Sequence, residues 1–241
     1  MKRYVLALIA VAACGDDGGG MVTPDSSTPM PDAPVTCPAV TPPLAAGMHT
    51  FYLSFEGVTI TKGACDDAKT NCSELVGQAS TVVPAFLPAE SDRDARIAVI
   101  AAEVQTALAQ FSVDVVRTRP ASGDYWMASI GGTSMAVAGV SGVTAGVKPT
   151  CQSVNKSSIS LVFDRGATVT DRAYADVITT TFGQLVGLVS VNLSGDCMCN
   201  AGSCTHTDAC TWGTSVSTQI NSCSRQVQNE QELLRTAVGC R

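Results

Sequence analysis

The sequence of 241 residues has little charge, few aromatic side chains and only two histidines, His49 and His206. Charged residues make up 15% of the chain, the net charge is -6, and no basic run extends beyond Lys2-Arg3. Binding to nucleic acid normally needs a basic patch, so we expect no nucleic-acid partner. No apolar stretch reaches the ~20 residues that a transmembrane helix needs, which excludes a helical membrane span.

The N-terminus resembles a bacterial lipoprotein signal. Two basic residues precede an apolar stretch that is too short to cross a bilayer and typical of the core of a signal peptide. The stretch ends in the tetrapeptide VAAC, which is similar to a lipobox and whose last residue is Cys14. The resemblance implies that residues 1–13 are removed and that Cys14 is lipidated. The alternative is an ordinary secretory signal in which Cys14 has no special role.

Residues 14–48 follow as a segment rich in proline, glycine and aspartate. Such a segment buries little apolar surface, so we expect an extended tether. A tether of this kind suits a domain held at the cell envelope by a lipid anchor, with the membrane as its partner. Gly15, rather than aspartate, follows the cysteine, which permits delivery to the outer membrane or the cell surface.

Hydrophobic periodicity predicts an α/β (or α+β) domain over residues 49–198 and a cysteine-rich lobe over 199–241. Apolar residues recur at helical spacing from Ile97 to Phe111, and Thr170 is placed to cap a second helix. The expected core is a small twisted sheet with two main helices. The expected elements are strand 50–55, an irregular connection over 61–90, helix 92–111, strands 113–119, 125–130 and 159–163, helix 171–188 and a short helix from Asn229, with 133–158 unassigned.

Ten cysteines besides Cys14 predict disulfide bonding, because an exported chain meets an oxidising environment. Their even number permits five bonds, whose connectivity the sequence does not reveal. Cys65 and Cys72 are spaced for a local loop. In the segment 197–210, which contains His206, a structural zinc cluster is the alternative. The ten are Cys37, Cys65, Cys72, Cys151, Cys197, Cys199, Cys204, Cys210, Cys223 and Cys240.

The segment 132–136, GTSMA, resembles the nucleophile segment of subtilisin-like proteases. A nucleophilic serine needs a histidine base and an acid that orients it. The only histidine that precedes Ser134 is His49, at the edge of the tether and without the expected sequence context. We therefore expect a turn after a strand here rather than a catalytic serine.

Residues 178–198, ITTTFGQLVGLVSVNLSGDCM, resemble the zinc-binding segment of metzincin metalloproteases, HExxHxxGxxH followed by a Met-turn. Gly187 matches the glycine at which the chain leaves the zinc helix, and Leu188 follows it as in matrixin-like members. Gly183 matches the residue before the second ligand, and Met198 matches the Met-turn. The expected order of strand, helix, strands and helix over about 49–200 is similar to that of the family.

The positions that would carry the chemistry are all replaced. The three ligand histidines align with Thr180, Gln184 and Ser190, and the catalytic glutamate aligns with Thr181. A catalytic zinc site needs three protein ligands and an open water position, and a general base must accept the proton of the water. Neutral hydroxyl and amide groups supply neither, and Asp176 on the same helix is a single carboxylate. We therefore expect no metal, no cofactor and no catalytic residue.

These observations predict a lipid-anchored, disulfide-stabilised and catalytically inactive metzincin-like protein that binds a peptide, a glycan or another envelope protein. One alternative is an active hydrolase, either a metallopeptidase with unconventional ligands or a serine enzyme. Another is a structural or adhesive surface lipoprotein. A further alternative is that the segment 180–189, TTFGQLVGLV, forms only a buried amphipathic helix that ends at a glycine, with no relation to metzincins.

Lipidation of Cys14 is the first testable prediction. Mass spectrometry of the exported protein should find a diacylglyceryl group on Cys14 as the N-terminal residue, and Cys14→Ser should release the protein from the membrane fraction. A mature protein that retains an unmodified Cys14 would contradict the lipobox interpretation.

Overall fold

The computed structural model describes residues 49–241 except 149, 152–155, 200–208, 219–222 and 224–225. These residues belong to one compact unit that spans 37–241. The predicted signal peptide, Cys14 and the predicted tether lie outside the described residues, as do Cys37, Cys204 and His206.

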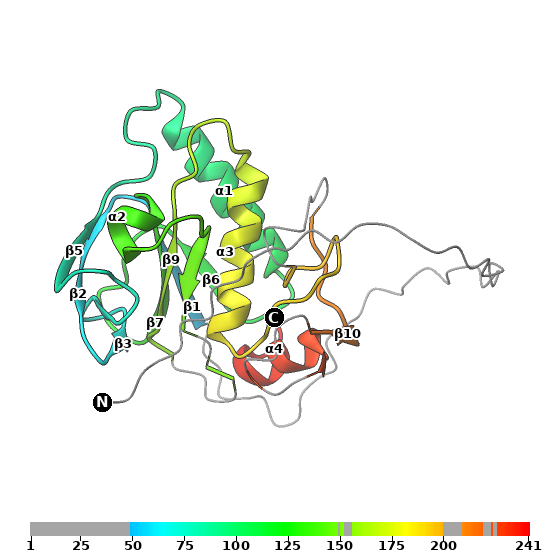
Figure 1. The fold of residues 1–241 in the computed structure, drawn as a ribbon. Coiled ribbons are helices and arrows are strands. Elements are labelled where there is room, and N and C mark those ends of the chain that lie inside the picture. Colours follow the sequence, from blue (N-terminus) through cyan, green and yellow to red (C-terminus); the bar gives the residue numbers. More distant parts are fainter. Residues whose placement is uncertain (1–48, 149, 152–155, 200–208, 219–222, 224–225) are drawn as a thin grey trace, which may run out of the picture. The chain divides into compact units, whose positions relative to one another are not determined.

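A five-stranded mixed sheet forms the centre of the fold (Figure 1). Its order is β6-β1-β7-β9-β8, and all neighbouring strands run parallel except β8, which is antiparallel to β9. All six residues of β7 are buried, which is typical of a central parallel strand covered on both faces. The strands are β1 His49–Ser54, β6 Val113–Val116, β7 Tyr125–Ile130, β8 Ala145–Val147 and β9 Ile159–Val162.

Two long helices, α1 (Arg93–Ala107) and α3 (Asp171–Leu185), pack together on one face of this sheet. Helix α3 begins as its sequence predicts, because the Thr170 hydroxyl oxygen accepts a hydrogen bond from the Ala173 amide at 3.2 Å. Helix α1 is shorter than expected, since regular helix gives way to a turn after Ala107. The mixed α/β class and the two main helices are confirmed.

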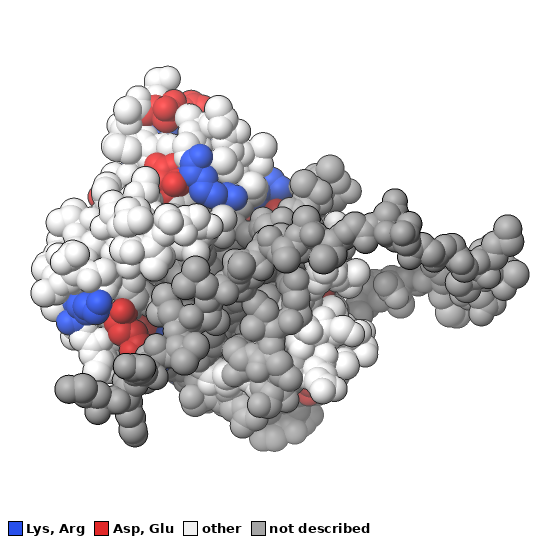
Figure 2. Space-filling model, in the orientation of Figure 1, with Lys and Arg blue, Asp and Glu red and all other residues white. Residues whose placement is uncertain are grey.

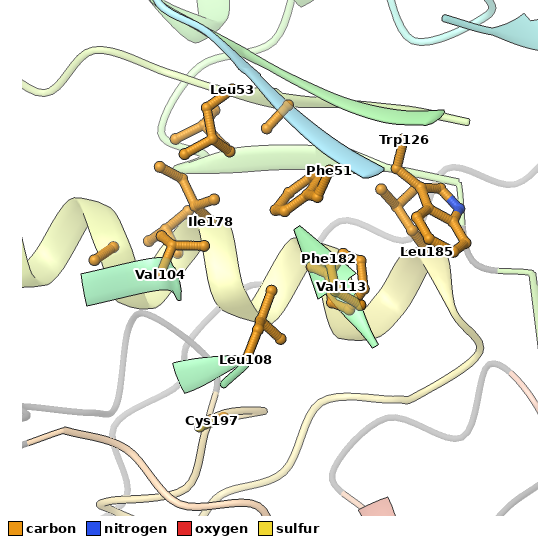
Figure 3. Close-up of a cluster of buried hydrophobic side chains, with 14 of the residues drawn as sticks. Phe51, Leu53, Val104, Leu108, Val113, Trp126, Ile178, Phe182, Leu185 and Cys197 are labelled. Carbon is orange, nitrogen blue, oxygen red and sulfur yellow. The ribbon is translucent and has the colours of Figure 1, made fainter. Parts of the chain in front are cut away.

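Aliphatic and aromatic side chains fill the layer between the sheet and the helices (Figure 3). The Phe182 ring on α3 lies 4.8 Å from the Phe51 ring and 5.4 Å from the Trp126 ring, between ring centroids. All three side chains are at most 1% exposed. Such aromatic pairs contribute about 0.5–1.5 kcal/mol each beyond their burial. The middle of α3 is thereby fixed against strands β1 and β7.

A second, smaller sheet covers the opposite face of the central sheet (Figure 1). The expectation of an irregular connection over 61–90 is wrong in this respect, because the region adds strands to a sheet that begins at Val58. These strands are short, and in β2 only Ile60 is buried, so the alternation is too brief to recognise. The predicted Cys65–Cys72 disulfide is present and joins two neighbouring segments of this sheet. The order is β3-β4-β2-β5, with β2 Val58–Lys62, β3 Asp66–Asp67, β4 Cys72–Ser73 and β5 Ser80–Val83.

The C-terminal segment packs on the same core as α1 and α3. Trp212, Val216, Leu234 and Val238 are buried in the cluster that contains Phe182. The segment contains β10 (Val216–Ser217), β11 (Val227–Gln228) and α4 (Glu230–Val238). The start of α4 confirms the predicted cap, since the Asn229 side chain accepts from the Glu232 amide.

Disulfide bonding is confirmed for all eight cysteines that the structure describes. Cys151 bonds to Cys223 and Cys197 bonds to Cys210, while Cys199 and Cys240 are also disulfide-bonded. Each bond can contribute about 2–4 kcal/mol by restricting the unfolded chain. Across the part of the chain that the structure describes, no helix combines the length and apolarity needed to cross a membrane.

Candidate functional site

The candidate site is the end of α3 together with the turn that follows it. The backbone φ of Gly187 is 98°, in the left-handed region that favours glycine. The Leu188 amide then donates to the Gly183 carbonyl at 2.9 Å, so the chain turns back against the helix. This is the exit from the helix that the sequence pattern around Gly187 predicts.

The turn brings two of the predicted positions together. The side-chain amide of Gln184 donates to the hydroxyl oxygen of Ser190, with 3.0 Å between Nε2 and Oγ. Ser190 is 8% exposed and Gln184 is half-buried. Thr180 lies one helical turn before Gln184 on the same face of α3. Its hydroxyl lies 2.8 Å from the Cys197 carbonyl oxygen and 2.9 Å from the Asp176 carbonyl oxygen.

Thr181, aligned with the catalytic glutamate, is buried and 2% exposed. Its hydroxyl donates to the Ile178 carbonyl oxygen at 2.9 Å, one turn back along the same helix. A neutral hydroxyl is too weak a base to take the proton of a water molecule, so Thr181 cannot replace the glutamate. The donor set at this site therefore consists of neutral hydroxyl and amide groups.

Met198 lies directly against the helix. Its side chain is 0% exposed, and a β-carbon at Gly183 would lie 2.2 Å from its sulfur atom. The turn that carries Met198 is held by two hydrogen bonds. The Met198 amide donates to Asp196 Oδ1 at 2.7 Å, and the Met198 carbonyl accepts from the Val191 amide at 2.9 Å. Gly183 thus permits a close approach of the Met198 side chain, which would have to shift if position 183 carried a β-carbon.

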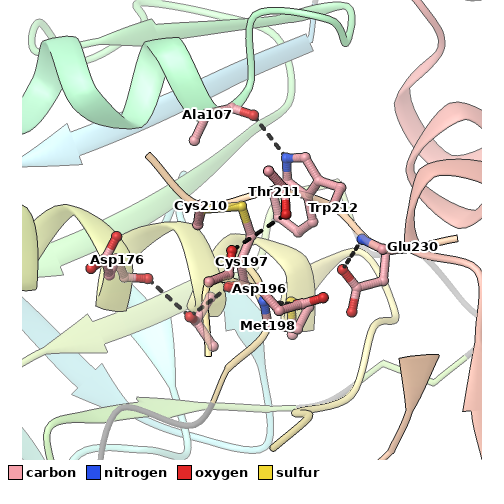
Figure 4. Close-up of a disulfide and its surroundings, with 12 residues drawn as sticks. Ala107, Asp176, Asp196, Cys197, Met198, Cys210, Thr211, Trp212 and Glu230 are labelled. Carbon is pink, nitrogen blue, oxygen red and sulfur yellow. Dashed lines mark hydrogen bonds between the residues drawn. A yellow bond between two sulfur atoms is a disulfide. The ribbon is translucent and has the colours of Figure 1, made fainter. Parts of the chain in front are cut away.

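The Cys197–Cys210 disulfide joins this turn to the C-terminal segment (Figure 4). The Cys197 amide donates to the Thr211 carbonyl at 2.9 Å, and the Trp212 indole donates to the Ala107 carbonyl at 2.8 Å. The two cysteine side chains are therefore part of the packed structure. The zinc-cluster alternative for 197–210 is wrong for Cys197, Cys199 and Cys210, because all three are in disulfides.

No group of three or more potential metal ligands from His, Cys, Asp and Glu occurs among the residues that the structure describes. The residues Thr180, Gln184 and Ser190 do not fit a catalytic zinc ion, since zinc binds imidazole, thiolate and carboxylate groups.

Two buried acids near the site were not identified from the sequence. Glu230 and Asp196 are 0% and 3% exposed, and the Gly213 amide donates to Glu230 Oε2 at 3.0 Å. Burial and the nearby Asp196 raise the pKa of Glu230 to about 8. An acidic residue in the first turn of a helix is usually an exposed partner of the helix dipole, so the sequence carried no signal of this environment.

The GTSMA segment does not form a catalytic serine site with His49. Ser134 begins the short helix α2 (Ser134–Ala138), after the C-terminal end of β7, and Thr133 caps that helix. His49 begins β1, which runs parallel to β7, and its ring lies 5.6 Å from the Trp126 ring. The two side chains therefore belong to opposite ends of the sheet.

Comparisons with known proteins assign no family: no family model matches the chain, and no curated protein matches it significantly.

The contact between Gly183 and Met198 can be tested by a double-mutant cycle. Gly183→Ala should lower the free energy of unfolding by about 1–3 kcal/mol through overpacking, and Met198→Ala by about 2–5 kcal/mol through a cavity. In the double variant the new methyl group enters the vacated space, so the combined loss in urea unfolding should be smaller than the sum. Gly146→Ala is the control, since its β-carbon would lie 3.9 Å from the nearest atoms. Strictly additive losses would contradict the contact.

Proposed function

We propose that this protein is a non-catalytic metzincin-like domain that binds an extended peptide segment at the cell envelope. The metzincin resemblance predicts a strand, a helix, further strands and then the helix that carries the ligand positions. The strands of the central sheet and the two long helices follow that order, as β1, α1, β6, β7, β8, β9 and α3, but the second sheet β2–β5 is inserted between β1 and α1 and the short helix α2 between β7 and β8. The observation that carries the proposal is the Gln184–Ser190 hydrogen bond beside Met198 and Gly183.

That hydrogen bond matters because it joins residues at the second and third ligand positions of the metzincin pattern. Position 184 lies on α3 and position 190 lies after the turn at Gly187. The turn at Gly187 brings these two positions together close to Met198, which is the arrangement that the metzincin pattern requires. The zinc ligands and the general base of a metallopeptidase are nevertheless absent, since no imidazole or carboxylate occupies the four positions.

The edge strand β8 supports the binding part of the proposal. The Phe163 amide donates to the Thr144 carbonyl at 3.0 Å, and Gly146 is paired with Leu161. Because the direction of backbone groups alternates along an antiparallel strand, the amide and carbonyl groups of Ala145 and Val147 face away from β9. Among the described strands, none pairs with this outer edge of β8. An extended peptide can add to such an edge through main-chain hydrogen bonds.

A peptide bound in this way would be recognised mainly through its backbone and apolar side chains. Ala145 and Val147 pack partly against the core and leave small half-exposed side chains at the edge. Lys148, the charged residue that directly follows β8, is paired with Glu74 at 2.9 Å, and most described atoms on the face shown in Figure 2 belong to uncharged residues. Electrostatic attraction therefore contributes little, and the ligand class that fits is an uncharged extended segment.

We also propose that the protein is exported and anchored through Cys14. The sequence of residues 1–14 supports this proposal. The eight described cysteines that are in disulfides add support, because disulfides persist mainly in oxidising compartments. A membrane-anchored domain that binds a peptide would act as an adaptor for another envelope protein.

Introducing histidines at the three ligand positions tests the metzincin alignment. Thr180→His, Gln184→His and Ser190→His together should create a zinc site, because two imidazoles would project from one face of α3 and the third from the turn. Calorimetry should show one zinc ion bound at least about tenfold more tightly than by the 180/184 double variant, which has only the helical pair. The unmutated protein should bind no zinc at micromolar metal. A folded triple variant that binds no more tightly than the double variant would contradict the metzincin alignment.

Peptide addition at β8 is tested by removing one outward-facing donor. Peptides selected from a random display library against the wild-type protein should bind Val147→Pro about tenfold more weakly, because one main-chain hydrogen bond is lost. Val147→Ala keeps the amide and is the matched control, which should retain most of the affinity. Equal affinity of the selected peptides for wild-type protein and the proline variant would argue against β8 as the binding edge.

A further inference from the structure

Two carboxyl groups meet in the interior behind the candidate site. Asp196 comes from the turn before Met198, and Glu230 is the first residue of α4. They are 3% and 0% exposed, and their side chains are hydrogen-bonded to each other. Figure 4 shows both acids in the region around Met198 and Trp212. An ionised carboxylate has no hydrogen to donate, so a hydrogen bond between two carboxyl groups requires that one of them be protonated.

The other hydrogen bonds of the pair leave that proton between the two acids. Glu230 Oε2 accepts from the Gly213 amide at 3.0 Å, and Glu230 Oε1 accepts from the Gln228 side-chain amide at 2.8 Å. Asp196 Oδ1 accepts from the Met198 amide at 2.7 Å. Each of these neighbours is a donor, which favours acceptor oxygens at those positions. The pair therefore connects the Met198 turn, the loop at Gly213 and the start of α4.

Gln228 extends this connection to the candidate site. Its Oε1 accepts from the Val189 amide at 3.0 Å, and its Nε2 donates to the Val189 carbonyl at 2.7 Å. Gln228 is 2% exposed and Val189 directly precedes Ser190. The carboxyl group of Glu230 orients Gln228, and Gln228 holds both backbone groups of Val189.

We propose that Asp196 and Glu230 share one proton, and that this proton holds the Gly213 loop and α4 against the turn that carries Ser190. When the proton is lost at alkaline pH, two negative charges remain side by side in the interior. The repulsion and the burial of the second charge then favour separation of the two acids. Loosening of the Gln228 contacts follows, and Ser190 loses its fixed position beside Gln184.

The neutral amides that donate hydrogen bonds to Asp196 and Glu230 are consistent with a shared proton, because they supply no compensating positive charge. Burial raises the pKa of Glu230 first, and the charge of Asp196 raises it further, to about 8. Of the cations that the structure describes in the C-terminal segment, Arg235 donates to Gln231 Oε1, and Arg241 pairs with Asp114 on β6. Glu232 on the same helix is exposed. Val189, Gly213 and Gln228 present only neutral groups to the pair.

Because the pKa of Glu230 is raised in the folded protein, the stability of the fold should decrease as the pH rises. The pKa of Glu230 in the folded protein, about 8, is above its ordinary value of 4.5. The folded protein therefore keeps a proton that the unfolded chain releases as the pH rises above 4.5. The contribution to stability is complete below pH 4.5 and is lost progressively as the pH rises through about 8.

The test compares urea unfolding of the wild type with Glu230→Gln and Asp196→Asn across pH 5 to 9. Glu230→Gln removes the titrating group and should lack this titration. Asp196→Asn supplies a permanent N–H in place of the shared proton and removes the neighbouring charge, so it should keep only the weaker titration that burial of Glu230 causes. The unfolding equilibrium constant of the wild type should rise, relative to Glu230→Gln, by up to about tenfold per pH unit below pH 8. Glu232→Gln, on the exposed side of α4, is the matched control and should follow the wild type. Should one amide variant fail to fold, the other gives the comparison.

Hydrogen exchange locates the effect within the fold. After correction for the intrinsic effect of pH, protection of the amides of residues 189–198 and 211–213 in the wild type should fall between pH 6 and 9. Protection in α1 should not fall, Glu230→Gln should show no such pH-dependent local change, and Asp196→Asn should show a smaller one than the wild type. A wild-type pH dependence equal to that of both amide variants would overturn the shared proton. A loss of protection spread evenly over the whole domain would overturn the local loosening of the candidate site.

Discussion

The close packing of Met198 against Gly183 is the contact on which the rest of this structure depends. Because Gly183 has no β-carbon, the turn that follows α3 lies directly on the helix. The Cys197–Cys210 bond then ties the C-terminal segment to that turn, and Trp212 packs at 6.0 Å from the Phe111 ring. A larger residue at position 183 would force the Met198 side chain to shift away from the helix and would loosen the packing of the turn.

Burial of this region requires that its polar groups find partners within the protein, because an unpaired buried group costs about 1–3 kcal/mol. Gln184 and Ser190 satisfy each other, and Thr180 uses the carbonyl oxygen of Cys197. Further inside, Gln228 serves both backbone groups of Val189. Positions that carry zinc ligands in the metzincin pattern are thereby used for neutral hydrogen bonds. A domain stabilised by aromatic packing and disulfides can keep its shape without a metal ion.

Several elements could be predicted because their causes lie within a few residues of each other. Thr170 and Asn229 cap the helices that follow them, and β7 begins and ends at the predicted residues Tyr125 and Ile130. The small second sheet could not be predicted, because β2 has one buried residue and β3 and β4 have two residues each. Such strands are stabilised by their neighbours and by the Cys65–Cys72 bond rather than by a pattern of their own.

The sequence by itself determined the positions of the main helices, the lack of ligating side chains at 180, 181, 184 and 190, and the glycines that permit the turn. Those properties depend on residue type and on local backbone preference. Only the tertiary structure decided that Cys151 bonds to Cys223, that Gln184 meets Ser190 and that Asp196 meets Glu230. Each of these contacts forms when packing of the apolar core brings different segments together. The polar groups enclosed by that packing acquire their partners, and Glu230 its raised pKa, from the surroundings that the folded chain creates.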